Sequence, residues 1–122
     1  MTTCGAVFVV DAGGCGGCLR ELRLLAALDP AAFGTCATPR HATVLAATGP
    51  VTHQMANPLA QAAAALPDGT PVLAIGDCAL DGGAFRDSAT VLGGVGAVVP
   101  DARAVPGCPP TPDQLRAALG VR

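Results

Sequence analysis

The residues of this chain that are best suited to chemistry are its six cysteines. Cys15 and Cys18 form a Cys-Gly-Gly-Cys motif, whereas Cys78 and Cys108 each lie far along the chain from that pair. Thiolates in such positions can hold a metal ion, ligate an iron–sulfur cluster or exchange disulfides. The cysteines are therefore the first candidates for a functional site.

The start of the chain and its hydropathy favour a reducing compartment. The first residues, Met1 to Cys4, lack the basic region that opens a signal peptide. No apolar run reaches the roughly 18 to 20 residues of a membrane span. We therefore expect a cytoplasmic protein with no direct membrane span, and in that compartment cysteines serve metal or redox roles more often than structural disulfides.

Composition bounds the class of protein further. All seven basic residues are arginines, they are scattered singly, and the formal net charge is −2, so no basic surface for nucleic acid is expected. At 122 residues the chain predicts a single domain, 1–122. It has no Trp or Tyr and only three Phe, so its core must be built from Ala, Val, Leu and Ile, which suits a buried parallel sheet.

Strand and helix patterns alternate along the sequence. Apolar, β-branched runs predict strands at 6–10, 43–47 and 71–75. A short fourth strand is predicted at 97–100, with 104–106 as the segment by which the chain exits from it. Helices are expected at 18–28, at 58–66 with Asn57 as its cap, and from Thr111 onward through Leu119. The glycine-rich segment 81–96 is expected to be loop with one short helix.

This alternation predicts an α/β fold, a flavodoxin-like open parallel sheet of about four strands flanked by helices. In such folds ligands bind outside the carboxyl ends of the strands. The Cys15–Cys18 pair follows the first strand, Cys78 follows the third and Cys108 follows the fourth. All four cysteines are thus expected at one edge of the sheet.

Four thiolates at one edge match the needs of a [4Fe–4S] cluster, which is commonly held by one close pair and two more distant ligands. Two alternatives remain open. One is a thiol-disulfide oxidoreductase that uses only Cys15 and Cys18, and the other is an interaction module stabilised by a Cys₄ zinc site. Cys4 and Cys36 lie away from these loops and are assigned no role, since a cysteine often acts as a small buried hydrophobe.

Four motifs in order make the chain resemble a known family. They are Cys15-Gly-Gly-Cys18-Leu-Arg-Glu21, Thr48-Gly49-Pro50-Val51-Thr52, Gly76-Asp77-Cys78 and Val105-Pro-Gly-Cys108-Pro-Pro110. Together they resemble the small, cluster-bearing subunit shared by [NiFe] hydrogenases and respiratory complex I, the 20 kDa subunit family. The resemblance implies that Cys15, Cys18, Cys78 and Cys108 ligate one [4Fe–4S] cluster, with Gly49 and Thr52 beside it.

One detail favours the hydrogenase-like branch of that family. Complex I members usually carry adjacent cysteines at the first site, whereas hydrogenase small subunits have Cys-x-x-Cys, and the membrane-bound group often has Glu at the place of Glu21. Glu21, the only Glu of the chain, is therefore expected near the cluster. The resemblance implies a non-catalytic electron-relay subunit of an oxidoreductase complex. Its partners would be a large catalytic subunit and further iron–sulfur or membrane subunits, located in the cytoplasm or peripherally at the cytoplasmic face of the membrane.

Overall fold

A computed structural model of the chain describes residues 5–13, 16–28, 33–36, 38–108 and 110–119. Its centre is a sheet of five parallel strands in the order β2-β1-β3-β5-β7. The strands are β1 (Gly5–Asp11), β2 (Phe33–Thr35), β3 (Val44–Thr48), β5 (Val72–Ile75) and β7 (Arg103–Val105). Counted among themselves, these strands follow the flavodoxin-like order 2-1-3-4-5, which confirms the expected fold class. The edge strand β2 was not predicted, and β7 lies later in the chain than the predicted fourth strand.

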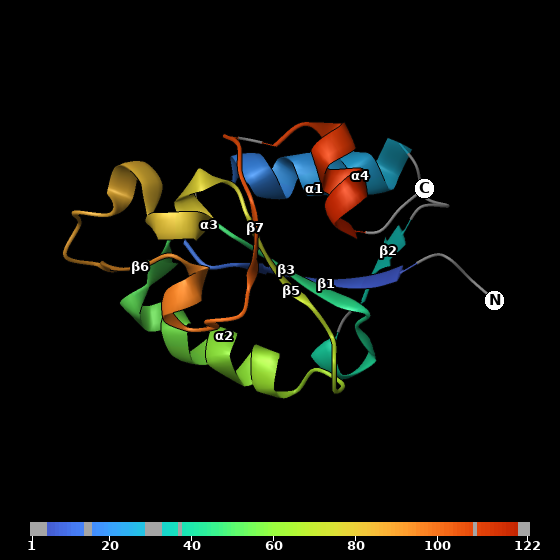
Figure 1. The fold of residues 1–122 in the computed structure, drawn as a ribbon, viewed down its shortest axis with the longest axis horizontal. Coiled ribbons are helices and arrows are strands. Elements are labelled where there is room, and N and C mark those ends of the chain that lie inside the picture. Colours follow the sequence, from blue (N-terminus) through green and yellow to red (C-terminus); the bar gives the residue numbers. More distant parts are fainter. Residues whose placement is uncertain (1–4, 14–15, 29–32, 37, 109, 120–122) are drawn as a thin grey trace.

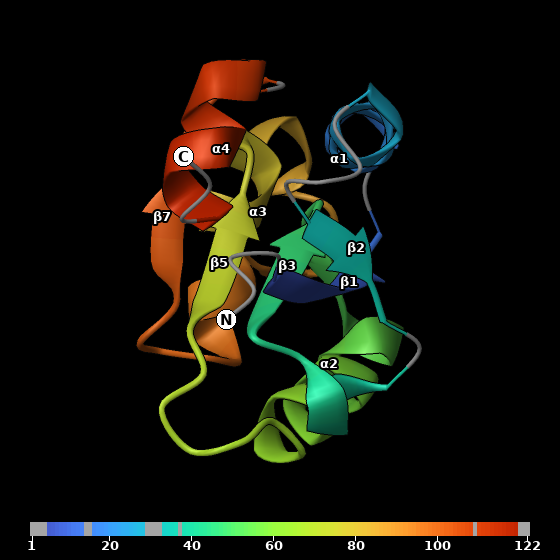
Figure 2. The same ribbon diagram turned by 90° about the vertical axis from the view of Figure 1, so that its right-hand side faces the viewer.

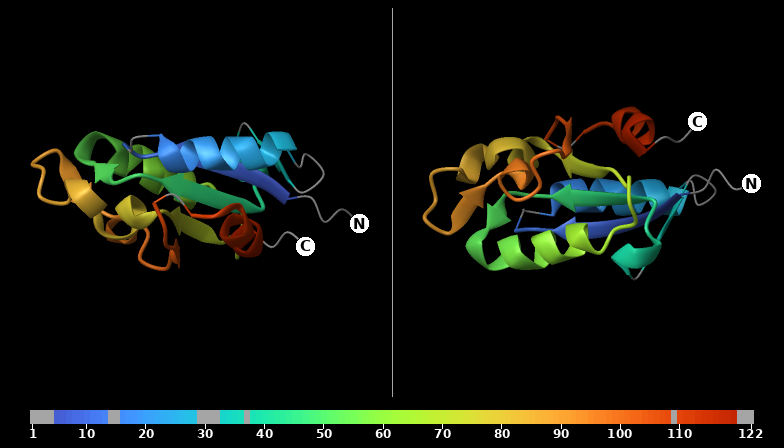
Figure 3. Two further views of the ribbon diagram at one scale, coloured as in Figure 1. Left: turned by 90° about the horizontal axis from the view of Figure 1, so that it is seen from above. Right: turned by 60° about the horizontal axis from the view of Figure 1, so that its bottom comes forward.

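Helices cover both faces of this sheet. They are α1 (Gly17–Leu28), α2 (His53–Ala64), α3 (Asp77–Asp81) and α4 (Pro112–Leu119), with single 3₁₀ turns η1 (Pro39–His41), η2 (Gly83–Phe85) and η3 (Val95–Ala97). Figure 1 shows α1 and α4 above the strands and α2 below them, and the view turned by 90° shows the same three layers end on (Figure 2). A second, two-stranded antiparallel sheet joins β4 (Val51–Thr52) to β6 (Val91–Gly93). The segment from η2 to β6 extends beyond the carboxyl ends of the main strands (Figures 1 and 3).

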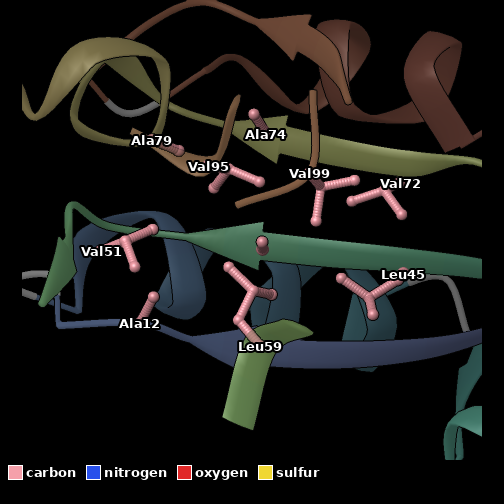
Figure 4. Close-up of a cluster of buried hydrophobic side chains, with 10 residues drawn as sticks. Ala12, Leu45, Val51, Leu59, Val72, Ala74, Ala79, Val95 and Val99 are labelled. Carbon is pink, nitrogen blue, oxygen red and sulfur yellow. The ribbon is translucent and has the colours of Figure 1, made fainter. Parts of the chain in front are cut away.

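The central strand β3 explains why this sheet needs helices on both faces. All five of its residues are buried. Val44 and Ala46 pack with Leu22 of α1 in one apolar cluster, whereas Leu45 and Ala47 belong to a second cluster on the opposite face. Figure 4 shows that second cluster, in which Leu59 of α2 lies beneath β3. Alternating side chains thus bury both faces of a parallel strand, as the apolar run predicted.

The predicted fourth strand at 97–100 was wrong. Val95–Ala97 forms the 3₁₀ turn η3, and the Val99 amide donates to the Val95 carbonyl at 2.8 Å. Val95 and Val99, four residues apart, both enter the second apolar cluster (Figure 4). A single helical turn therefore buries this valine-rich run, and the strand itself forms later, at Arg103–Val105.

The second helix begins earlier than the sequence suggested. Asn57 and Pro58 lie inside α2, and the cap is Thr52, whose hydroxyl accepts a hydrogen bond from the Met55 amide at 3.3 Å. The His53 amide also donates to the Thr90 carbonyl at 3.0 Å, just before β6. The Thr cap and this anchoring bond fix the start of α2, so the proline is accommodated within the helix although it has no N–H to donate there.

The other helices match the sequence patterns closely. In α1, Leu22 and Leu25 are buried, whereas Leu28 is 74% exposed and does not belong to the core. At the start of α4, Thr111 and Gln114 bond reciprocally: each backbone amide donates to the other's side chain, at 2.8 and 3.2 Å. This is a capping box. Within the described residues, no helix has the length and apolar character needed to cross a membrane.

Candidate functional site

A pocket of about 160 Å³ opens at the carboxyl edge of the main sheet. Its walls come from four separate loops and from the first turn of α1. The lining residues are Gly16, Gly17, Cys18, Leu19, Thr48, Gly49, Asp77, Cys78, Gly107 and Cys108. Three of the four cysteines singled out in the sequence thus line one pocket.

The sheet explains how residues so distant in sequence meet. β1, β3, β5 and β7 are parallel neighbours, so their carboxyl ends lie side by side. Cys18 follows β1, Cys78 follows β5 and Cys108 follows β7, so each thiol is supplied by a different strand exit. Cys18 and Cys78 are half-buried and Cys108 is exposed. The arrangement is the ligand position expected for an open α/β sheet.

Gly76 sets how closely Cys18 approaches the neighbouring strand. Its backbone has φ +93° and ψ 159°, a conformation that is essentially limited to glycine. A Cβ atom at this position would overlap the Cys18 sulfur and would lie 3.4 Å from the Gly107 carbonyl oxygen. The thiol of Cys18 therefore occupies the space that a side chain would fill at the exit of β5.

Gly83 likewise lies in close contact with Cys78. A Cβ atom there would lie 2.9 Å from the Cys78 sulfur and 3.0 Å from its Cα. The thiols of Cys18 and Cys78 thus pack directly against glycine backbone. Backbone that approaches sulfur this closely can surround a bulky ligand without competing side chains.

The structure separates the other predicted site residues. Gly49 lines the pocket. Glu21 is half-buried on α1, one turn beyond Cys18, and Thr52 caps α2, so neither belongs to the lining. The Thr52 hydroxyl also donates to the Ala12 carbonyl at 3.3 Å, which ties it to the loop that leads toward Cys15. Cys15 itself lies outside the described residues.

Thr48 is a lining residue that sequence reasoning did not single out. It is only 2% exposed, and its hydroxyl lies 3.5 Å from a carboxylate oxygen of Asp11, at the end of β1. The signal was its place as the last residue of a strand whose neighbours all end in candidate ligands.

The residues present suit a thiolate-bound group. Among the residues that the structure describes, no three His, Cys, Asp or Glu side chains are grouped closely enough to hold a metal ion by themselves. The lining nevertheless holds three cysteines, and two of their sulfurs rest closely against glycines. Soft thiolate donors in glycine-lined surroundings fit an iron–sulfur cluster, which would be held by Cys18, Cys78 and Cys108 together with Cys15.

Thr52 offers a first test of how the site is supported. Replacing it with Ala removes the cap of α2 and the bond to Ala12, so we expect the free energy of unfolding to fall by about 1 kcal/mol. Thr52→Ser keeps the hydroxyl and should stay within a few tenths of the original value. Urea unfolding followed by circular dichroism measures both, and equal stabilities for the two variants would contradict the capping role.

The structure thus has a pocket lined by three cysteines at the carboxyl edge of a flavodoxin-like sheet. The model of the family described as "NADH ubiquinone oxidoreductase, 20 Kd subunit" matches residues 15–120. The chain belongs to this family, which includes small subunits of hydrogenases and of NADH-quinone oxidoreductases and consists generally of iron–sulfur subunits. The resemblance seen in the sequence motifs is therefore confirmed.

Relatives from several organisms match most of the chain. Formate hydrogenlyase subunit 7 of Escherichia coli is 41% identical over 87% of this chain and 43% of its own length. The probable membrane-bound hydrogenase subunit mbhJ of Pyrococcus furiosus is 36% identical over 89% of this chain and 68% of its own. An NADH-quinone oxidoreductase subunit of Roseiflexus is 39% identical over 78% of this chain, but this chain spans only 37% of that relative.

Solved structures show the same fold at lower sequence identity. A chain of the membrane-bound sulfane sulfur reductase, an archaeal respiratory membrane complex, aligns with a TM-score of 0.76 at 22% identity, covering 94% of this chain and 67% of that one. A chain of an NAD⁺-reducing [NiFe]-hydrogenase aligns with a TM-score of 0.67 at 18% identity, covering 90% and 85%. These likenesses establish the architecture.

Proposed function

We propose that this chain is an electron-transfer subunit that carries one [4Fe–4S] cluster on Cys15, Cys18, Cys78 and Cys108. The observation that supports it most is the convergence of three of these cysteines, from three strand exits, on one pocket. Cys15 stands two residues before α1, whose first turn supplies Cys18. A dithiol exchanger would need only the Cys15–Cys18 pair, so the presence of Cys78 and Cys108 in the same pocket favours a cluster.

The cofactor would supply one-electron chemistry, and the chain's own residues would hold it and tune its potential. The thiols of Cys18 and Cys78 are half-buried, so burial would limit solvent contact with that side of the group. Gly49 and Gly107 line the pocket without side chains, and their backbone can approach sulfur closely. Thr48, which is buried, also lines the pocket. Burial and hydrogen bonding to sulfur are two means by which a protein shifts a cluster potential.

The relatives suggest where such a subunit works. Their printed names are those of hydrogenase, formate hydrogenlyase and NADH-quinone oxidoreductase subunits. We infer that this chain likewise joins a multi-subunit complex of the [NiFe]-hydrogenase or NADH-quinone oxidoreductase kind. Its partners would be a large catalytic subunit and further iron–sulfur or membrane subunits, and substrate chemistry would take place in the large subunit.

Anaerobic reconstitution with iron and sulfide tests the cofactor. We expect about four iron and four sulfide per chain, together with a broad absorbance near 400 nm that bleaches on reduction, as a cubane requires. Two results would overturn the proposal. A colourless protein that takes up one zinc ion would indicate a zinc-stabilised module. A colourless protein that reduces disulfides through Cys15 and Cys18 would indicate a thiol oxidoreductase.

A further inference from the structure

The segments that carry Cys78 and Cys108 are joined by hydrogen bonds beyond the ends of their strands. β5 and β7 pair in parallel, with Ile75 opposite Val105. The pairing continues past the strands, since the Gly76 amide donates to the Val105 carbonyl and the Asp77 amide donates to the Gly107 carbonyl, both at 2.8 Å. The residues that follow these contacts on the two segments are the two cysteines.

Asp77 makes a further hydrogen bond between the same two segments. Its carboxylate oxygen Oδ1 accepts a hydrogen bond from the Gly107 amide at 2.9 Å. Asp77 therefore binds both polar groups of the Gly107 backbone, the carbonyl through its own amide and the amide through its side chain. Gly107 has φ +135°, a conformation that other residues rarely adopt, so this peptide needs outside contacts to hold its orientation.

We propose that Asp77 is a positioning residue for the cluster: through Gly107 it fixes the spacing and orientation of Cys78 relative to Cys108 before any cofactor binds. This inference rests on the proposed function. Asp77 acts through the backbone of the neighbouring segment. Because Asp77 is adjacent to one ligand and Gly107 to the other, loss of this bond would loosen both thiols together.

A second explanation for an acid at this position is electrostatic. Asp77 is the first residue of α3, where a negative charge interacts favourably with the helix dipole. Two substitutions separate the explanations. Asp77→Asn removes the charge but keeps a carbonyl oxygen at the same distance from the backbone. Asp77→Glu keeps the charge but moves the carboxylate one methylene farther out, which takes it out of register with the Gly107 amide.

The first measurement needs no cofactor. In the apo protein, hydrogen exchange of the Gly107 amide reports directly on the bond. We expect the Gly107 amide of Asp77→Asn to retain most of its protection from exchange, and that of Asp77→Glu and Asp77→Ala to exchange at least tenfold faster.

The same order of variants is expected after reconstitution. A chelator should remove iron at least fivefold faster from the Glu and Ala variants than from the original protein. The Asn variant should stay within about twofold, and only the Glu and Ala variants should show altered electron paramagnetic resonance of the reduced cluster.

Asp81 provides a matched control on the same helix. Its carboxylate accepts a backbone hydrogen bond from the Gly83 amide at 2.8 Å, but this bond stays within one segment. Asp81→Ala should change the exchange of the Gly107 amide by less than twofold. The proposal would be overturned if Asp77→Glu retained protection and cluster while Asp77→Asn lost them, or if all the Asp77 variants matched the original protein. Failure of the original protein itself to take up iron and sulfide would instead overturn the proposed function.

Discussion

Replacing Cys78 with Ser should prevent the reconstituted protein from holding a complete [4Fe–4S] cluster. Cys78 is the proposed ligand at the exit of β5, and it is half-buried against Gly83, so none of the other described cysteines is placed to substitute for it. We expect the iron content to fall from about four to three or fewer per chain. Absorbance near 400 nm should fall at least twofold, with both values measured after anaerobic gel filtration.

Cys36→Ser is the matched control for this substitution. Cys36 is also half-buried, but it follows β2, and its thiol donates to the Thr38 carbonyl at 3.3 Å. A serine hydroxyl can make the same bond, so the iron content should equal that of the original protein. Full cluster loading in Cys78→Ser, or equal losses in both variants, would contradict the ligand assignment.

Gly76→Ala should destabilise the fold by more than the backbone conformation alone would cost. The backbone conformation of Gly76 costs a residue with a Cβ about 1 to 3 kcal/mol. The added methyl group would also displace the Cys18 sulfur. We expect the free energy of unfolding of the apo protein to fall by about 3 kcal/mol or more, measured by urea unfolding, and cluster uptake to fall with it.

Gly69→Ala separates the backbone cost from the displacement of the thiol. Gly69 also has a positive φ, +80°, but a Cβ atom there would meet nothing within 4 Å. This variant should lose only about 1 to 2 kcal/mol, the cost of the backbone conformation alone, and its cluster uptake should be unchanged. If the two variants had equal stability and equal uptake, Gly76 would have no special relation to Cys18.

The sequence predicted those parts of the fold that depend on repeating local patterns. The apolar runs at 6–10, 43–47 and 71–75 correspond to β1, β3 and β5, because a strand buried on both faces is apolar at every position. The 3₁₀ turn η3 was missed because a short valine-rich run has the same composition whether it forms a strand or a helical turn. The start of α2 was missed because Thr52 caps the helix from within a short strand pairing that only the folded chain creates.

The candidate site could be predicted as far as its cysteines, but no further. The rule that ligands lie at the carboxyl edge predicted all four cysteines on one side of the sheet. The pocket brings Cys18, Cys78 and Cys108 together, whereas Cys15 lies outside the described residues. Thr48 and Asp77 were not expected in the lining. Their positions depend on where a strand ends and on how two loops bond to each other, and neither property is encoded in residue spacing.

The separation of the ligands along the chain has a consequence for how the protein matures. Cys18 and Cys108 are about 90 residues apart, so one cofactor that binds both would close most of the chain into a loop. In chain-entropy terms, a crosslink of that span stabilises the folded state by about 4 to 5 kcal/mol, because it removes conformations from the unfolded chain. Cofactor binding and folding would then be thermodynamically linked. Since Cys108 is the last of the four proposed ligands along the chain, an emerging chain could hold a partial ligand set and no completed cluster until Cys108 had left the ribosome.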